Sequence, residues 1–275
     1  MSNFGRSAFS LPGVVRPPSH AKVHATLKTA KLTVTVTDPC GKPLAAVEVE
    51  VTGVAIQNTA ADGTAKFNAV PAGQVLNIKA RKTDYGPVPP AGGTFTPGET
   101  VDSETFTVGQ NAAVTMKLTF KGNPPYEPSR WNKAPVIGST NCYAYAANDP
   151  DGHPPGKPQP GQHCGSPWTT LSCAEVSRAA QCDGFIPAPS PPPPKPGYYP
   201  VALVLAPGAD YHWYRLDDNC FWSHKPGNTD ARNVDAAGSP VTNPETANRN
   251  YGALNYTVFC GYFYVPAAGI RTGLP

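Results

Sequence analysis

Strict alternation of apolar and polar residues marks the first half of the chain. Residues 32–37 (Leu-Thr-Val-Thr-Val-Thr) and 47–52 (Val-Glu-Val-Glu-Val-Thr) alternate with a period of two and are rich in β-branched side chains. Because successive side chains of a strand point to opposite faces, each segment predicts a strand with one buried face. An Asp-Gly turn at 62–63 precedes another alternating run, and residues 76–80 and 113–120 continue the series. This spacing predicts a β-sandwich of about a hundred residues.

Composition supports a fold of short strands and loops. The 275 residues include 34 prolines and 26 glycines, and only 15% are charged, which excludes an all-helical fold. The length allows two domains of ordinary size. The net charge of +3 is scattered without a basic run, so we expect no nucleic-acid partner. No apolar segment approaches the roughly 18 residues of a membrane span, and no apolar signal region follows the first residues, so we expect no membrane span and no secretory signal.

The turns of this first half carry the signs of a known family. Gly41-Lys42-Pro43-Leu44 opens an alternating strand, the Asp-Gly turn precedes an Ala-Lys-Phe strand at 65–67, and Val70-Pro71-Ala72-Gly73 precedes the next strand. Together they resemble the carboxypeptidase-regulatory-like, transthyretin-like sandwich over about residues 30–120. The resemblance implies an accessory domain without catalytic residues, such as a spacer, adaptor or weak binder.

The chain divides around this sandwich. We predict a flexible leader at 1–28, the sandwich at 29–121, a Pro-rich linker at 122–136 and a second domain at 137–275. In that domain, residues 141–148 and 170–182 have helical composition, and apolar runs near 201–205 and 258–265 predict strands. The second domain is therefore predicted to be α+β with a small antiparallel sheet.

A cysteine and two histidines in this domain suggest nucleophilic catalysis. Cys142 lies in the first turn of the predicted helix, where unpaired backbone N–H groups and the helix dipole favour a thiolate. His212 and His224 are twelve positions apart across a hairpin, near the same end of its two strands. We expect Cys142 to be the nucleophile, His212 the general base and His224 the group that orients His212. Alternatives for the orienting group are Asp217, Asp218 and Asp210, and Asn141 is a candidate for assisting the oxyanion hole.

The order of these elements is similar to that of papain-like cell-wall peptidases. The hairpin resembles the NlpC-type pattern in spacing and aromatic content. Around the cysteine the chain departs from that pattern, since Asn141 replaces the usual Asp and Tyr143-Ala144 the usual Ser-Gly. The Cys-x-x-Tyr-Ala sequence is closer to the CHAP-type amidases. This departure weakens the substrate assignment more than the fold assignment.

Six further cysteines (40, 164, 173, 182, 220 and 260) remain beside Cys142, an even number that is compatible with disulfides or with buried thiols. A structural zinc site would draw on His153, His163 and the nearby cysteines, but no Cys-x2-Cys or His-x3-His pair is present. We therefore expect no metal and no cofactor.

Three functions follow from this reading. The first is a cysteine peptidase or amidase that cleaves an amide of bacterial peptidoglycan stem peptides. It would be synthesised in the cytoplasm and secreted or injected without a signal peptide into the periplasm or cell wall of a target cell, with a secretion-machine spike and an immunity protein as partners. The second is a toxin that cleaves or deamidates a host protein. The third is a non-enzymatic tail or surface-binding protein in which Cys142 is structural.

Overall fold

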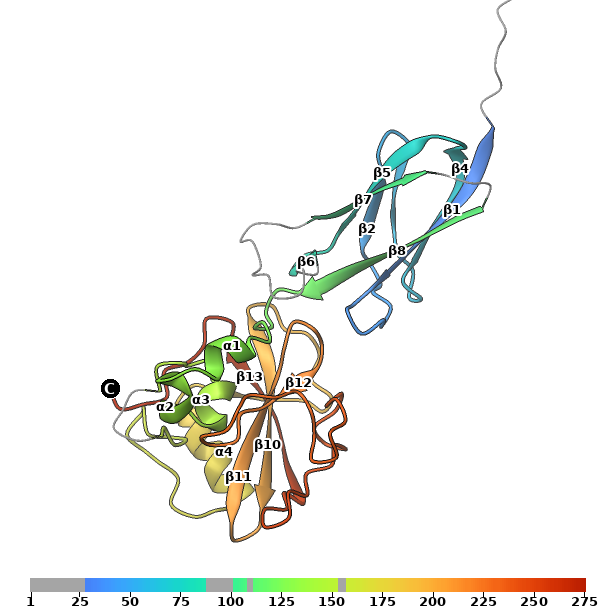
Figure 1. Ribbon diagram of the computed structural model, residues 1–275. Helices are drawn as coiled ribbons and strands as arrows, with labels where there is room; N and C mark the ends of the chain where they lie inside the picture. The colour runs from blue at the N-terminus through green and yellow to red at the C-terminus, as the bar shows by residue number, and fades with distance from the viewer. Residues whose placement is uncertain (1–27, 88–100, 108–110, 153–156) are drawn as a thin grey trace, which may run out of the picture.

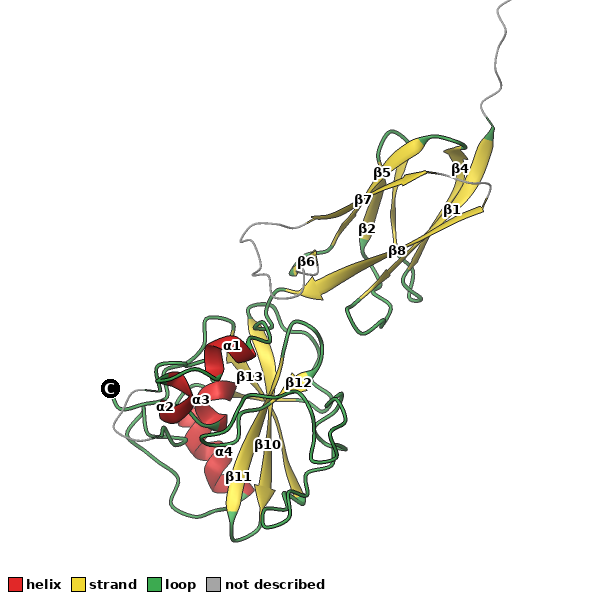
Figure 2. Cartoon of the chain, viewed as in Figure 1, coloured by secondary structure: helices red, strands yellow, loops and turns green. Residues whose placement is uncertain are grey.

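The computed structural model describes residues 28–87, 101–107, 111–152 and 157–275, and it is rich in β-structure with a few short helices (Figures 1 and 2). The predicted leader at 1–28 lies almost wholly outside the described residues. Within them, no helix is both long and apolar enough to cross a membrane.

Two four-stranded sheets pack face to face in the first half of the chain (Figure 1). In the first sheet the order is β4 (Thr64–Pro71), β1 (Thr29–Thr37), β8 (Asn111–Phe120) and β6 (Tyr85–Pro87). In the second it is β3 (Ala55–Asn58), β2 (Glu48–Val51), β5 (Val75–Arg81) and β7 (Val101–Thr107). Strands β1 and β8 are parallel and the other pairs are antiparallel.

The alternation seen in the sequence forms the core of this sandwich. Leu32, Val34 and Val36 of β1 are buried while the threonines between them are half-buried, and Val49 and Val51 of β2 face them from the second sheet. All five predicted strands are confirmed. Strands β3, β6 and β7 were not predicted; β3 is exposed along its length and β6 has only three residues, so neither carries a clear burial pattern.

A five-stranded antiparallel sheet forms the second half. Its order is β12 (Trp222–Ser223), β11 (Asp210–Leu216), β10 (Tyr198–Ala206), β13 (Val258–Pro266) and β9 (Ile186–Ala188). The helices are α1 (Pro128–Trp131), α2 (Val136–Ser139), α3 (Cys142–Ala146) and α4 (Cys173–Cys182). One face of the sheet packs on α3 and α4, and the other is covered by residues of the long loop between β12 and β13.

The segment predicted to be a linker, 122–136, is packed onto this second half. It contains α1, whose Trp131 is buried edge-on against Tyr145 of α3 with ring centroids 4.7 Å apart. The two halves also contact each other directly. The Thr119 hydroxyl at the end of β8 donates to the carbonyl of Asp218 at 2.6 Å, and Cys40 is bonded to Cys220 in the β11–β12 turn.

All six cysteines other than Cys142 form disulfides, which confirms the expectation of cross-links. The pairs are Cys40–Cys220, Cys164–Cys182 and Cys173–Cys260. These bonds also occupy every thiol that a zinc site would have used. Disulfides persist in oxidising compartments, so this chain belongs outside a reducing cytosol.

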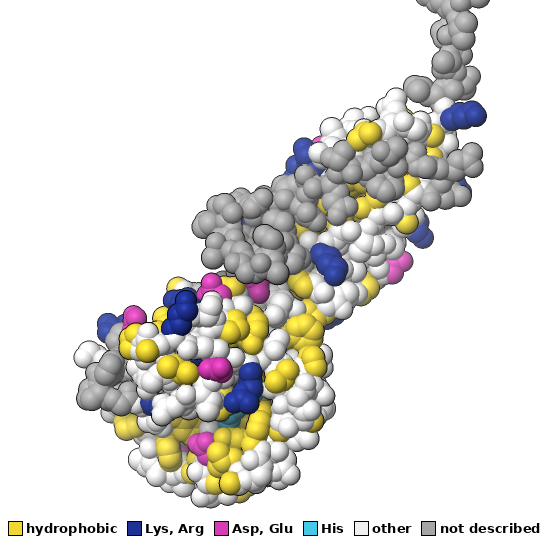
Figure 3. All heavy atoms as spheres, in the orientation of Figure 1, with side chains coloured by type: hydrophobic (Ala, Val, Ile, Leu, Met, Phe, Trp, Pro, Cys, Tyr) yellow, Lys and Arg dark blue, Asp and Glu magenta, His cyan; other side chains and the backbone are white. Residues whose placement is uncertain are grey.

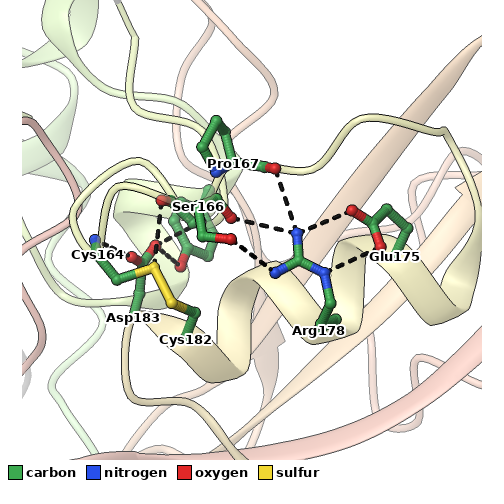
Figure 4. The surroundings of a disulfide bond; sticks show 9 residues. Cys164, Ser166, Pro167, Glu175, Arg178, Cys182 and Asp183 are labelled. Atoms are coloured by element: carbon green, nitrogen blue, oxygen red, sulfur yellow. Dashed lines mark hydrogen bonds and ion pairs between the residues drawn. A yellow bond between two sulfur atoms is a disulfide. The ribbon is translucent and has the colours of Figure 1, made fainter.

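The Cys164–Cys182 disulfide closes a compact corner beside α4 (Figure 4). Asp183 accepts a hydrogen bond from the backbone N–H of Cys164 at 2.9 Å, and nearby Arg178 pairs with Glu175 on the exposed face of the helix. The buried carboxylate of Asp183 also accepts the Tyr143 hydroxyl at 2.7 Å. This corner therefore anchors the loop at 161–168 to α3.

Candidate functional site

Helix α3 begins at Cys142 because Asn141 caps it. The Asn141 Oδ1 atom accepts the backbone N–H groups of Tyr143 and Ala144 at 3.1 and 3.0 Å. These are two of the unpaired donors of a helix N-terminus. The Asn141 Nδ2 atom donates to the carbonyl of Pro158 at 2.7 Å. Asn141 therefore positions the cysteine through the backbone, and one of its two amide hydrogens is engaged by Pro158.

The sulfur of Cys142 lies against an open edge of β11. Strand β12 pairs with β11 only at Arg215 and Leu216, so the earlier residues of β11 are not paired with β12. The Cys142 thiol is directed at the carbonyl of Tyr211, 4.0 Å from Sγ, and the sulfur accepts the backbone N–H of Trp213. The residue between these two contacts is His212, so the thiol is placed at the point where the predicted base leaves the strand.

His212 and His224 are joined by a hydrogen bond, and a backbone carbonyl determines which of them donates. His224 Nε2 lies 3.0 Å from the carbonyl oxygen of Val234, which can only accept, so Nε2 carries the proton. In neutral His224 the other nitrogen, Nδ1, is then an acceptor, and it lies 2.8 Å from His212 Nε2. His212 therefore donates from Nε2, which leaves its Nδ1 unprotonated and able to act as a base.

Cys142 and His212 line one cavity of about 580 Å³. Its wall is otherwise mixed, with Trp168, Leu171 and Tyr256 among its apolar or aromatic members. His224 is fully buried behind His212 and does not line the cavity. The Pro-rich loop at residues 187–196 does not line the cavity either. It lies instead at the junction with the sandwich, where Pro192 and Pro194 share a hollow with Cys220.

Burial favours the neutral forms of Cys142 and His212. It raises the pKa of the Cys142 thiol to about 12, with a further contribution from the negative charge of Asp210. Burial, followed by the nearby His224, holds the pKa of His212 well below its usual value, and burial lowers the pKa of His224 to about 4. The expected resting thiolate is therefore wrong for this structure. The helix N-terminus does not outweigh the loss of solvent, and the site rests as thiol and imidazole.

Asp217 does not orient His212. Its carboxylate accepts hydrogen bonds from Arg215 Nε at 2.8 Å and from the Ser223 hydroxyl. His224 holds the place next to His212 that the sequence left open between a histidine and an aspartate. Asp210 is also bound elsewhere, because the Tyr256 hydroxyl donates to it at 2.8 Å.

Arg215 and Asp217 belong to a buried polar network that the sequence did not reveal. Both side chains are fully buried, and Arg215 also donates to the Tyr145 hydroxyl at 3.0 Å and to the Pro125 carbonyl at 3.2 Å. The Tyr145 hydroxyl in turn lies 2.7 Å from the hydroxyl of Ser223, the residue before His224. The network therefore joins the helix of the cysteine to β12, which directly precedes the second histidine.

Lys225 is a second buried cation that supports the site. Its ammonium donates to the carbonyls of Ile137, Thr140 and Gly227 at 3.0, 2.9 and 2.7 Å. Thr140 directly precedes Asn141, so this lysine ties the arm of His224 to the start of the cysteine helix. The sequence gave no sign that Lys225 would be buried. The Ser-His-Lys-Pro segment that contains it is equally compatible with the exposed end of a strand.

Comparison with known proteins places the chain in a family. No family model matches the sequence. Insoluble matrix shell protein 1 of Ruditapes philippinarum is 38% identical to it over 140 residues, which is 51% of this chain and 88% of that protein. The chain therefore belongs to the family of insoluble matrix shell protein 1. The match is longer than the 121 residues that precede the predicted linker, so it cannot be confined to the sandwich and leader.

Proposed function

We propose that the chain is a papain-like cysteine hydrolase that cleaves an amide bond. The observation that carries the proposal is the placing of Cys142 and His212 on one cavity, with His224 and the Val234 carbonyl holding His212 as a neutral base. A structural cysteine does not require a hydrogen-bonded pair of buried histidines beside it. The NlpC-type and CHAP-type resemblance of the sequence supports the same chemistry, and the transthyretin-like resemblance supports an accessory role for the sandwich.

The proposed reaction starts from the neutral pair. His212 Nδ1 takes the thiol proton as the Cys142 sulfur attacks the amide carbonyl, which gives a tetrahedral oxyanion. The backbone N–H of Cys142, at the first position of α3, can donate to that oxyanion. Collapse breaks the C–N bond, and His212 returns its proton to the leaving amine. Water then hydrolyses the thioester with His212 as base, releasing the acid and restoring the thiol.

His224 stabilises the charge that forms on His212. When His212 becomes an imidazolium ion, its Nε2–H still donates to His224 Nδ1, whose tautomer the Val234 carbonyl maintains. A neutral imidazole in this role is weaker than a carboxylate would be, so the proton is held on His212 only transiently. This fits a site that rests as neutral thiol and imidazole.

Peptidoglycan stem peptides are the first substrate that we propose, as the resemblance to cell-wall peptidases implies. Purified chain with its disulfides intact is expected to release soluble fragments and new amino groups from sacculi, whereas the Cys142→Ala variant releases none. Intact sacculi together with cleavage of a protein substrate would favour the toxin hypothesis instead. The secretion spike and immunity partner remain predictions of the same hypothesis.

A second candidate is a non-catalytic extracellular matrix protein. The similarity to insoluble matrix shell protein 1 and the three disulfides of this chain favour it, and both support an extracellular location. Under this function Cys142 is a buried structural thiol. Wild-type and Cys142→Ala proteins would then behave alike in every hydrolysis assay and in binding to insoluble matrix material.

A further inference from the structure

The cavity of the proposed active site is lined by one lysine, Lys157, and by one acid, Asp210. Lys157 lines it and makes no side-chain hydrogen bond or ion pair among the residues that the structure describes. A smaller cavity of about 140 Å³ adjoins it, sharing His212 and Tyr256, and is lined by Arg232. Within the same described ranges, the Arg232 guanidinium forms no ion pair and donates only to the Thr229 hydroxyl, at 3.2 Å. Two positive side chains therefore flank the reacting residues.

The single acid in the lining is less available than these cations. Asp210 accepts the Tyr211 backbone N–H at 2.9 Å and the Tyr256 hydroxyl at 2.8 Å, so each carboxylate oxygen has a partner. The Lys157 ammonium lies beside Gly227, which also lines the cavity. Its Nζ atom is 3.4 Å from the point where a Cβ on Gly227 would lie. Burial lowers the pKa of Lys225 to about 8, with a further contribution from repulsion by the nearby ammonium of Lys157.

We propose that Lys157 forms an anion subsite, assisted by the field of Arg232, and that the enzyme selects amide substrates carrying a carboxylate close to the scissile bond. An unpaired ammonium on a partly enclosed wall is poised to form a charge-assisted hydrogen bond, which is stronger than a neutral one. A substrate carboxylate would also supply the counterion that Lys157 lacks among the described residues. Figure 3 shows basic and acidic side chains close to a small histidine surface on the visible face of the C-terminal half. The inference rests on the proposed function, because it names the substrate class of the same site.

Binding to a variant that cannot cleave tests the subsite separately from the chemistry. The probes are tripeptide amides in matched pairs that differ only in Glu or Gln, with the changed residue placed at each position in turn. Calorimetry is done on full-length Cys142→Ala protein, alone and combined with Lys157→Gln, Lys157→Arg, Arg232→Gln or Lys133→Gln. Lys133 is an exposed lysine that does not line the cavity, so it controls for general surface charge.

At the best position, we expect the Glu peptide to bind about tenfold more tightly than its Gln partner, as one charge-assisted bond implies. Lys157→Gln should abolish that preference, Lys157→Arg should keep most of it, Arg232→Gln should weaken it two- to threefold, and Lys133→Gln should leave it unchanged. The preference should also fall with added salt. Equal binding of Glu and Gln peptides throughout the panel, or a preference that survives Lys157→Gln, would overturn the inference. Absence of turnover by the wild-type protein would overturn the proposed function alone, because the binding preference is measured without turnover.

Discussion

Replacing Arg215 with methionine tests the buried network that holds the site. The side chains of Arg215 and Asp217 are both 0% exposed, and the Nε to Oδ1 distance between them is 2.8 Å. Methionine fills a similar volume but leaves the Asp217 carboxylate buried without its cation. It also removes the donors to the Tyr145 hydroxyl and the Pro125 carbonyl.

Breaking a buried ion pair by removing one partner costs about 3–5 kcal/mol. For a chain of this size that corresponds to a fall in melting temperature of roughly 6–20 °C. The double variant Arg215→Met/Asp217→Leu should recover most of this loss, because the uncompensated charge is gone. Arg178→Met is the matched control: it breaks the Arg178–Glu175 pair, whose side chains are 45% and 24% exposed, and should change stability little.

Calorimetry and urea denaturation of the oxidised proteins measure these differences. The reasoning is refuted if Arg215→Met melts at the same temperature as Arg178→Met. It is equally refuted if the double variant is no more stable than Arg215→Met, because the cost would then not come from the orphaned carboxylate.

Three further predictions follow from the site. Asn141→Ala should remove about 1 kcal/mol of stability and slow any Cys142 chemistry, since the helix loses its cap; urea midpoints and hydrolysis rates measure the two effects. His212 and His224 have pKa values below the usual 6.5 in the folded chain, so between pH 6.5 and 4 the unfolded chain binds more protons than the folded one. Stability should therefore be lost as the pH falls from 6.5 towards 4. The urea midpoint measured against pH should show this loss, and His224→Gln should make it smaller. Cys40→Ser should destabilise the chain by up to about 5 kcal/mol because the bond to Cys220 closes a loop of 180 residues, and a melting temperature equal to wild type would contradict this.

Periodicity was sufficient to predict most of the fold. Alternation identified β1, β2, β4, β5 and β8, because each buries one face against the opposite sheet. It could not identify β7, which pairs with β5 although its sequence does not alternate strictly, or the position of α1, which depends on the burial of a single tryptophan. The disulfide pairs were also beyond prediction, since six cysteines allow many pairings and only the tertiary structure selects one.

The sequence identified the three candidate catalytic residues but not the groups that hold them in place. Spacing alone placed His212 and His224 near each other, because a hairpin aligns the ends of its strands. It favoured His224 over Asp217 as the group that contacts His212 but could not exclude the aspartate, since that contact depends on side-chain direction. The raised pKa of Cys142 depends on enclosure by distant segments, which no local motif records. The carbonyl that fixes the tautomer, from Val234, has no sequence signature at all.

Acylation of Cys142 by an activated ester tests the central claim most directly. The oxidised chain would be mixed with p-nitrophenyl acetate at neutral pH, with p-nitrophenol release followed before steady state and the acylated residue located by mass spectrometry. The account predicts a burst of one product per chain with a thioester on Cys142. It also predicts that this step is lost in Cys142→Ala and about 10²–10⁴-fold slower in His212→Ala. Acylation elsewhere only, or an equal rate in wild type and His212→Ala, would contradict the cysteine-hydrolase account.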